Sequence, residues 1–208
     1  MEEREDLVRP SVLRLWSRYY PGYDGRAFDQ RLAQHLKPSS RVLEIGAGSG
    51  LRPQKAYDLR GKVSRYVGID LDERVLNNPN QDESYVADAS SLPFEGTSFD
   101  LVFSSMVAEH LEHPQLAFAE VARVLKPEGV FLFETPGRWY YPMLLARALP
   151  HGLRVALVGW AKVGRESDDV FPSFYRCNDH LSIQRWASRA GLEAKVEYRS
   201  IPPGYLKF

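Results

Sequence analysis

Apolar residues follow two periods along this chain. In some segments they are contiguous or alternate and are rich in β-branched or aromatic types, which is typical of buried strands. In others they recur every three or four residues, which is typical of helices with one buried face. The predicted strands are Val42–Ile45, Ser64–Asp70, Ser84–Ala87, Phe99–Ser105, Val130–Thr135 and Glu193–Arg199. The predicted helices are Glu2–Tyr20, Arg26–Leu36, Leu51–Leu59, a short one from near Leu71, Pro114–Val124 and Leu181–Ala190.

Strands and helices alternate at a spacing that predicts an α/β fold. We expect a doubly wound, mostly parallel sheet with helices on both faces. A chain of this length is expected to form one domain over residues 1–208. Its expected parts are N-terminal helices in 1–40, a core in 41–135, an insertion in 136–180, and a last helix and strand in 181–208.

The segment 136–180 interrupts the alternation with prolines and aromatic residues. We expect it to lie over the carboxyl ends of the strands as a cap that shapes a pocket. Apolar and basic residues within 139–163 would also suit an amphipathic surface that faces a membrane. The apolar runs are short, which favours the cap.

Composition narrows the classes of function. The chain carries 27 basic and 27 acidic side chains, so it lacks the basic field on which nucleic-acid-binding proteins rely. Cys177 is the only cysteine, which excludes a disulfide within the chain and disfavours a cysteine zinc site. No run approaches the roughly 20 apolar residues of a membrane span, and the charged start MEEREDLVRP is unlike a signal peptide. We therefore expect a cytoplasmic protein.

The residues after the first strand carry the clearest chemical signal. Gly46, Gly48 and Gly50 stand at alternate positions, with Ala47 between the first two. Glycines allow positive φ and bring backbone N–H groups close to a ligand, as in strand–turn–helix units that bind nucleotides. Glu44 stands at the carboxyl end of the strand, where open α/β sheets bind ligands. The alternative is an ordinary turn whose glycines serve packing.

Acidic residues also end the next two strands. Asp70 is placed to bind both hydroxyls of a ribose, although a cap for the following helix is the alternative role. Asp88 is placed to accept from an exocyclic amino group, and the Ala89 N–H beside it to donate to a ring nitrogen. That pair would bind adenine. The fourth strand ends in two small hydroxyl residues, Ser104 and Ser105.

Taken together, these motifs resemble the class I S-adenosylmethionine-dependent methyltransferases, in the small-molecule, quinone-biosynthesis-like branch (methyltransferase type 11). The matching segments are LEIGAGSG, GID, ADASSLPF, SFDLVFSSMVAEHLEHP and EVARVLKPEGVFLFETP, within Arg41–Pro136, with a weaker continuation over Leu181–Arg199. The resemblance implies a Rossmann-like fold, S-adenosylmethionine as cofactor and S-adenosylhomocysteine as product.

The resemblance also implies roles for single residues. Glu44 would orient the glycine turn or the methionine amino group. The methionine part would pass close to Gly46, Ala47, Gly48 and Gly50, and the sulfonium would lie beside Ser104, Ser105 and Met106. The ribose would bind Asp70, and the adenine would pack on Leu71 and meet Asp88 and Ala89 at its edge.

Three alternatives fit less well. An NAD-type Rossmann oxidoreductase would need a third glycine at position 51, where Leu51 stands. A catalytically silent methyltransferase fold that only binds a partner would have lost the cofactor acids, and all three are present. A nucleic-acid methyltransferase would show a basic face or an NPPY-type tetrad, and neither is in the sequence. We therefore expect an enzyme that methylates a small organic acceptor, with oxygen favoured over carbon and nitrogen.

A hydroxyl acceptor needs a group that takes its proton. His110, just past the fourth strand, is our first candidate for this base, and the alternative is that it only packs or hydrogen-bonds the backbone. Weaker candidates are Asp168, Asp169, Tyr175 and His180, while His113 precedes a proline and suits a helix entry. No metal is expected, because the sequence has no compact cluster of metal ligands.

The family's sheet usually ends with a seventh, antiparallel strand. Only nine residues follow Arg199, and Pro202 and Pro203 are among them. We therefore expect either a sheet that is incomplete in this chain or an edge that another element covers.

Overall fold

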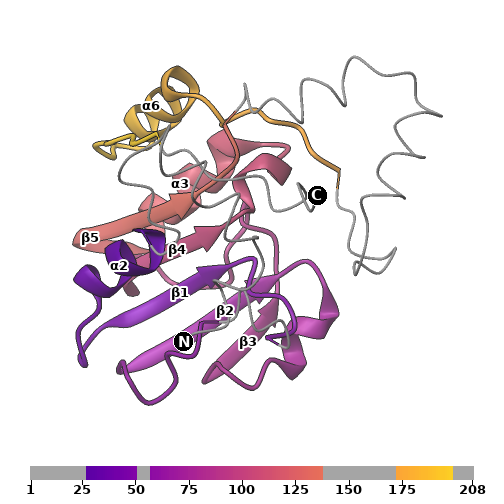
Figure 1. The fold of residues 1–208 in the computed structure, drawn as a ribbon, viewed down its shortest axis with the longest axis vertical. Helices are drawn as coiled ribbons and strands as arrows, with labels where there is room; N and C mark the ends of the chain where they lie inside the picture. The colour runs from indigo at the N-terminus through magenta and orange to yellow at the C-terminus, as the bar shows by residue number, and fades with distance from the viewer. Residues whose placement is uncertain (1–26, 51–56, 138–171, 199–208) are drawn as a thin grey trace, which may run out of the picture. The chain divides into compact units, whose positions relative to one another are not determined.

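A computed structural model describes residues 27–50, 57–137 and 172–198 (Figure 1). The strands are β1 (Arg41–Ile45), β2 (Arg65–Asp70), β3 (Glu83–Val86), β4 (Phe99–Ser105) and β5 (Leu125–Glu134). The α-helices are α2 (Ala27–His35), α3 (Pro114–Val124) and α6 (His180–Arg189). Two short 3₁₀ helices are η2 (Glu73–Asn77) and η3 (Ala108–His110).

The strands form a parallel sheet with the order β3-β2-β1-β4-β5. After β3 the chain therefore passes back over β2 and β1 to reach β4. The strands β1 and β4 are neighbours at the point where the direction of strand addition reverses. In open α/β sheets this switch point, at the carboxyl ends of the strands, is where ligands bind. The predicted α/β fold with a doubly wound parallel sheet is confirmed.

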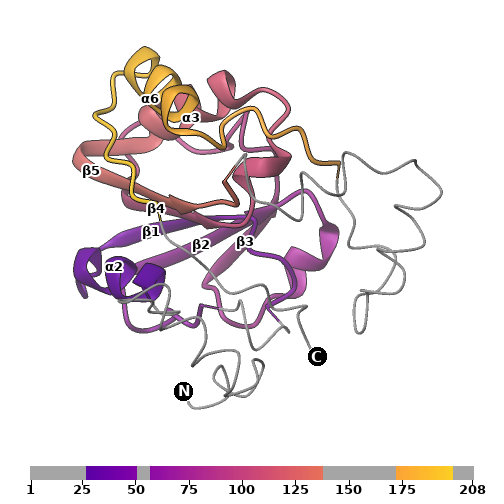
Figure 2. The same cartoon turned by 45° about the horizontal axis from the view of Figure 1, so that its top comes forward.

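Helices cover both faces of the sheet, with α2 on one side and α3 and α6 on the other (Figure 2). Leu32 of α2 packs against Val42 and Phe103 on its face. Leu43 and Val102, from the same two strands, face the other way and pack against α3. Because successive strand side chains point to opposite faces, the contiguous apolar runs of β1 and β4 are buried on both sides.

The predicted helix over Pro114–Val124 is confirmed at both ends. Pro114 fits the first turn, where its missing N–H costs nothing. The buried side chains of α3 share one face: Ala117, Phe118, Val121 and Val124. In α6, Asp179 caps the first turn in a reciprocal capping box with Ser182, and Gly191 takes φ +76° just past the end, which is typical of a glycine that ends a helix.

The strand β5 begins earlier than the predicted strand Val130–Thr135. The strand begins at Leu125, which pairs with Phe99, and Leu101 pairs next with Val130. The four residues between these pairs, 126–129, therefore form a bulge that does not pair with β4, and Glu128 within it has φ +63°. Hydrophobic periodicity does not reveal that Leu125 pairs with β4 before the bulge at 126–129.

Two further predictions are wrong within the described residues. The helix predicted over Leu51–Leu59 is absent at Tyr57–Leu59, and the sixth strand predicted over Glu193–Arg199 is absent at 193–198. The second error has a clear cause. Leu192 and Ala194 do pack on the cluster around Phe118. The alternation of apolar and polar residues in this segment therefore reports that one face of it is buried. A strand also needs a neighbouring backbone, which the pattern does not report.

Some predictions fall outside the described residues. These are the helix Glu2–Tyr20, most of the helix Leu51–Leu59, nearly all of the cap, the surface in 139–163, and any strand after 199. The chain divides into two compact units, and the unit that comprises 28–138 and 172–196 contains the sheet described above. Within the described ranges, no helix is both long and apolar enough to cross a membrane.

Candidate functional site

The glycine turn after β1 is built from left-handed residues. Gly46, Gly48 and Gly50 have φ values of +79°, +56° and +67°. The N–H groups of Gly46 and Ala47 donate to the Ile69 carbonyl at 2.8 and 3.0 Å, which ties the turn to β2. A Cβ on Gly46 would lie 2.2 Å from Val107, whereas one on Gly48 would meet none of the described residues within 4 Å. Of the three turn glycines, Gly48 therefore has the most space beside it among the residues that the structure describes.

Asp70 ends β2 beside this turn. Its Oδ2 accepts from the Gly48 N–H at 2.9 Å, and its Oδ1 accepts from the Asp72 N–H at 3.0 Å. The cap of η2 is Asp72, which accepts from the Arg74 N–H, so the capping role considered for Asp70 belongs to Asp72. A carboxylate accepts about four hydrogen bonds, and Asp70 therefore retains capacity for ribose hydroxyls. Leu71, next along the chain, is 59% exposed.

Asp88 and Ala89 follow β3. Asp88 is exposed, and its Oδ1 accepts from the Ser90 N–H at 2.7 Å, which fixes the turn that holds it. Ala89 is buried. The Ala87 N–H donates to the Asp70 carbonyl at 3.0 Å, so the ends of β2 and β3 are joined at the edge where both acids stand.

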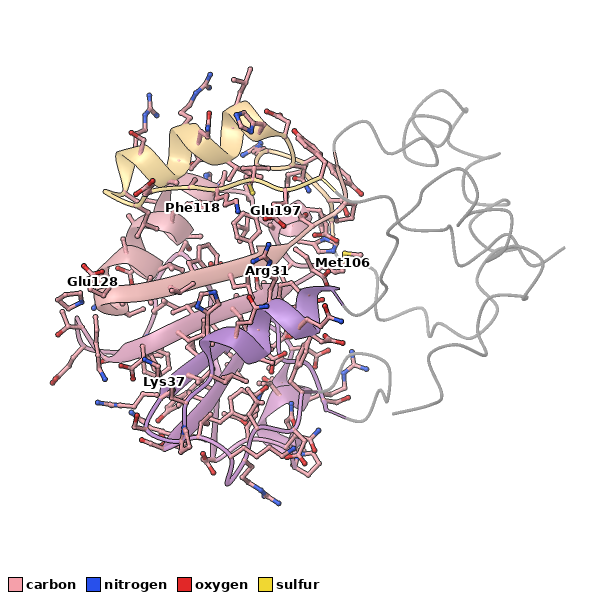
Figure 3. All side chains as sticks on the ribbon, turned by 60° about the vertical axis from the view of Figure 1, so that its left-hand side comes forward. Arg31, Lys37, Met106, Phe118, Glu128 and Glu197 are labelled. Atoms are coloured by element: carbon pink, nitrogen blue, oxygen red, sulfur yellow. The ribbon has the colours of Figure 1, made fainter. Side chains whose placement is uncertain are left out.

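The end of β4 is held by β5. The Ser105 hydroxyl donates to Glu134 at 2.6 Å, and the Met106 N–H donates to the Glu134 carbonyl at 3.0 Å. Ser104 is buried, and Met106 takes φ +58°, a backbone strain that neighbouring contacts must maintain. Met106 and Glu128 lie at opposite ends of the sheet (Figure 3).

Glu44 is buried on the α2 face of the sheet, at 4% exposure. Its Oε2 accepts from the Tyr66 hydroxyl and from Gln81 Nε2, the latter at 3.3 Å. Burial raises the pKa of the Glu44 carboxyl to about 7, although these two donors oppose the rise. Burial and the neighbouring Glu44 raise the pKa of the Tyr66 hydroxyl well above its ordinary value, so Tyr66 stays protonated and donates.

Gln81 reaches Glu44 across a glycine. A Cβ on Gly68, which is level with Glu44 in the sheet, would lie about 2 Å from the Gln81 amide atoms. The Ser84 hydroxyl holds that amide by donating to Gln81 Oε1 at 2.8 Å. A side chain at position 68 would therefore displace the Gln81 amide from its place beside Glu44.

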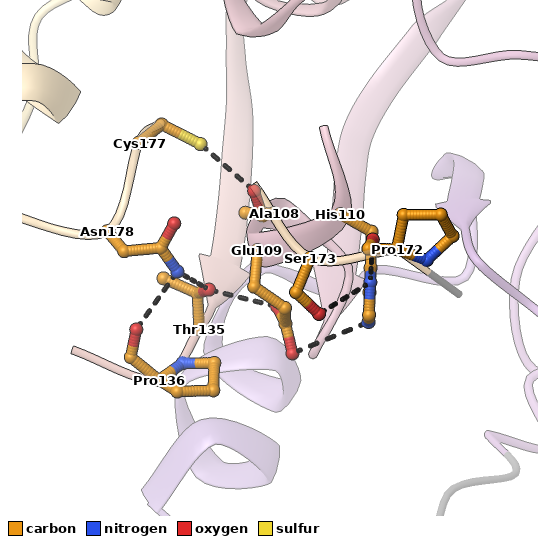
Figure 4. A network of polar contacts seen from close by, with 9 residues as sticks. All are labelled: Ala108, Glu109, His110, Thr135, Pro136, Pro172, Ser173, Cys177 and Asn178. Carbon is orange, nitrogen blue, oxygen red and sulfur yellow. Dashed lines mark hydrogen bonds and ion pairs between the residues drawn. The ribbon is translucent and has the colours of Figure 1, made fainter. Parts of the chain in front are cut away.

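His110 lies in η3, beyond the end of β4 (Figure 4). Its Nδ1 is 2.8 Å from the Pro172 carbonyl oxygen, which can only accept, so Nδ1 carries a proton. In the neutral imidazole the lone pair is then on Nε2, and Nε2 is 3.9 Å from Glu109 Oε1. The backbone bond considered as an alternative role is therefore present, and it fixes the tautomer that a base acting through Nε2 would need.

Glu109 is buried behind His110 and held by a polar network (Figure 4). The Thr135 hydroxyl donates to Glu109 Oε2 at 3.0 Å, and Asn178 Nδ2 approaches Thr135 Oγ1 at 2.6 Å and donates to the Pro136 carbonyl at 2.9 Å. The N–H groups of Phe174 and Tyr175 donate to the Glu109 carbonyl at 2.8 and 3.1 Å. The network joins the residues after 171 to the end of β4 through Glu109.

Comparison with known proteins decides the family. A model described as "Methyltransferase domain" matches residues 43–133. The demethylmenaquinone methyltransferase of Renibacterium salmoninarum is 33% identical over 184 residues, which is 80% of this chain and 72% of that protein. The chain belongs to the class I S-adenosylmethionine-dependent methyltransferases. The resemblance in the sequence motifs is thereby confirmed.

Other relatives of this methyltransferase align with different shares of its length. A ubiquinone/menaquinone biosynthesis C-methyltransferase of Cupriavidus taiwanensis is 29% identical over 96% of this chain and 82% of its own length. A malonyl-[acyl-carrier protein] O-methyltransferase of Halorhodospira halophila is 32% identical over 68% of this chain, which spans only 48% of that protein. The crystal structure of a methyltransferase-like protein from Bacillus halodurans shares the fold, with a TM-score of 0.55, 20% identity, and coverage of 80% of this chain and 69% of that one.

The described residues of this methyltransferase fit the family's cofactor. Gly48 leaves space among the described residues at the turn, Asp70 retains acceptor capacity beside it, and the apolar Leu71 is exposed next to Asp70. The assignment of these positions to the methionine, ribose and adenine parts stays a prediction. Within the described ranges, no group of three His, Cys, Asp or Glu side chains suits a metal ion.

Several residues of the site escape the sequence motifs. Tyr66 and Gln81 hold Glu44, Asn78 contacts the glycine turn, and Glu109 stands beside His110. Gly68 is the available signal for Gln81, since a glycine inside a strand indicates close approach of another group. Glu109 adjoins His110 in sequence, but only the tertiary network shows that it is buried.

Proposed function

We propose that this methyltransferase transfers the methyl group of S-adenosylmethionine to the oxygen of a small organic acceptor, with His110 as the base. The observation that carries the proposal is the His110 tautomer. The Pro172 carbonyl holds the proton on Nδ1, so the lone pair is on Nε2. In the proposal, Nε2 takes the proton from the hydroxyl group that is methylated. Support also comes from the position of His110 just past β4, next to the β1/β4 switch point.

The cofactor supplies a methyl group that its sulfonium has already activated. In our proposal Asp70 accepts from the ribose hydroxyls, Leu71 packs on the adenine, and Asp88 accepts from the adenine amino group. The methionine part lies against the backbone at Gly48. Glu44 precedes this turn and lies on the face of the sheet that α2 covers. Ser105 and Met106 bring the end of β4 toward the reacting centre. The chain's task is then alignment of donor and acceptor and exclusion of water.

Glu109 has a defined part in this scheme. When Nε2 of His110 takes a proton, the imidazole becomes a cation 3.9 Å from Glu109 Oε1. A buried carboxylate at that distance stabilises the imidazolium electrostatically. Thr135 and Asn178 keep the carboxylate in place, so their role is positional.

Carbon is the second candidate for the acceptor atom. A relative that covers most of both chains, from Cupriavidus taiwanensis, is named as a C-methyltransferase. A phenol that loses its proton also becomes nucleophilic at its ring carbons, so the same base at His110 serves either outcome. The net charge of zero favours a small molecule over a nucleic acid as the acceptor.

Calorimetry with S-adenosylhomocysteine tests the first half of the proposal, and we expect binding to one site per chain. The second half is tested with labelled S-adenosylmethionine and a panel of small phenols, hydroxyquinols and carboxylic acids. Mass spectrometry and NMR of the product then distinguish an O-methyl from a C-methyl group. Absence of cofactor binding overturns the proposal, and cofactor binding without methylation of any acceptor favours the silent, partner-binding alternative.

A further inference from the structure

The connection between η2 and β3 approaches the glycine turn closely. Asn78, in this connection, is 8% exposed. Its Nδ2 lies 3.2 Å from both the Ala47 and the Gly48 carbonyl oxygens and donates to them. The side chain therefore bridges two successive peptide groups of the turn, thirty residues away in sequence.

Asn80 extends the same contact. Its N–H donates to Asn78 Oδ1 at 3.0 Å, which fixes the orientation of the Asn78 amide, and its own Nδ2 donates to the Gly50 carbonyl at 3.0 Å. A Cβ on Gly50 would lie 2.0 Å from Asn78 Oδ1 and 2.9 Å from Asn80 Nδ2. Gly50 is therefore needed because the two asparagines pack directly on it.

The turn is consequently held from two sides. Its N–H groups are bound by Ile69 and Asp70 at the end of β2, and its carbonyl groups are bound by Asn78 and Asn80 from the following connection. Buried polar groups that are all satisfied define one arrangement of the backbone. A binding loop already in one arrangement loses less entropy when its ligand binds.

We propose that Asn78 and Asn80 are positioning residues that hold the glycine turn ready for S-adenosylmethionine. The inference rests on the proposed function and assigns to the η2–β3 connection a role in cofactor affinity. It excludes a role in the methyl-transfer step, because both amides act on the backbone of the turn. The effect of their loss therefore falls on cofactor binding and leaves turnover by the loaded enzyme nearly unchanged.

The test compares Asn78→Ala and Asn80→Ala with Asn77→Ala, a control at an exposed neighbouring asparagine. Calorimetry with S-adenosylhomocysteine and initial rates against S-adenosylmethionine concentration are measured for each. We expect Asn78→Ala to raise both the Kd and the KM about tenfold or more, with kcat within about twofold of the parent. Asn77→Ala is expected to match the parent. A lower kcat with an unchanged KM would overturn the inference.

Asn78→Asp serves where the alanine variant folds poorly. It keeps the size of the side chain and the acceptor for Asn80, but replaces the donor by an oxygen that faces two carbonyl groups. We expect a loss of affinity at least as large as for alanine. If the parent binds S-adenosylhomocysteine and this variant binds it equally well, the inference fails and the proposed function stands. If the parent does not bind, the proposed function fails and the inference with it.

A double-mutant cycle examines the contact itself. Gly50→Ala places a methyl group into the Asn78 amide, so its cost in cofactor affinity should fall when Asn78→Ala is already present. Equal costs in the two backgrounds would mean that Asn78 does not occupy this position in solution, and would overturn the inference.

Discussion

The Asp70 carboxylate and the Gly48 N–H are joined by a hydrogen bond of 2.9 Å between the ends of two neighbouring strands. Asp70 thus fixes the turn at Gly48, the turn glycine whose Cβ position meets no described residue within 4 Å. In the proposed complex the same carboxylate also accepts from the ribose. Cofactor affinity and the shape of the turn are therefore coupled through one side chain.

We predict that Asp70→Ala weakens the binding of S-adenosylhomocysteine by at least about tenfold. The loss of a hydrogen bond to a charged group costs about 1.5–3 kcal/mol, and each 1.4 kcal/mol is about tenfold in affinity. Titration calorimetry measures the change. Asp58→Ala, at an acid with a 63% exposed side chain, is the control and should bind as the parent does. An unchanged affinity for Asp70→Ala would remove the proposed ribose contact.

We predict that His110→Ala lowers kcat by about 10²–10⁴ while cofactor affinity is retained. Glu109→Gln should lower kcat less, because it removes the charge beside the imidazole and leaves Nε2 in place. Since Glu109 acts through His110, the double variant should be close to His110→Ala alone. Steady-state rates with saturating cofactor provide the measurement. A rate that His110→Ala leaves unchanged would indicate that orientation alone drives transfer and that His110 is structural.

We predict that Glu44 makes the fold less stable as pH rises. The pKa of its carboxyl is about 7 in the folded chain and near its ordinary 4.5 when unfolded, so the folded state holds the extra proton between these values. Stability from this group is complete below about pH 4.5 and is lost as pH rises through about 7, by on the order of 3 kcal/mol.

Glu44→Gln isolates that contribution. The variant keeps an acceptor for Tyr66 and has no proton to lose, so its advantage in stability over the parent should grow from pH 5 to pH 8. Urea denaturation at each pH gives the difference. A difference that is constant with pH would show that Glu44 stays ionised in the folded chain.

We predict that Cys177 does not react with thiol reagents in the folded protein. It is fully buried and donates to the Ala108 carbonyl at 3.2 Å, and burial, with Glu109 and Asp179 nearby, raises the pKa of the thiol to about 12. At pH 8 the thiolate fraction is then about 10³ times lower than for an exposed cysteine. DTNB should detect one thiol only in denaturant. Prompt reaction of the native chain would show that the loop around Cys177 opens readily.

Much of the fold follows from local patterns. The β4 and α3 boundaries agree with prediction because each element carries its own limits, as Pro114 does at the start of α3. The position of Glu44, Asp70 and Asp88 at one edge of the sheet was predictable because parallel strands have their carboxyl ends there, while their roles toward a cofactor stay predictions. The sixth strand was predicted wrongly from such a pattern, because the apolar residues Leu192 and Ala194 report only which face is buried.

The partners of the site residues were beyond local patterns. Gln81 lies 37 positions from Glu44, and Asn78 lies 31 positions from Ala47, so no periodicity connects them. Asparagines before a strand ordinarily indicate a turn, which is the interpretation that the sequence supports for Asn78. Their contact with the glycine turn depends on the register between β1 and β2 and emerges only when the sheet is assembled.

The bulge at 126–129 of β5 offers a site at which the enzyme can be labelled or tethered to a surface. Pro127 and Glu128 are exposed and lie outside the ladder, between the paired residues Leu125 and Val130. Glu128 is also at the opposite end of the sheet from Met106 (Figure 3). A dye, an affinity peptide or a surface tether inserted between Pro127 and Glu128 would therefore leave strand pairing intact and keep the cofactor end facing outward.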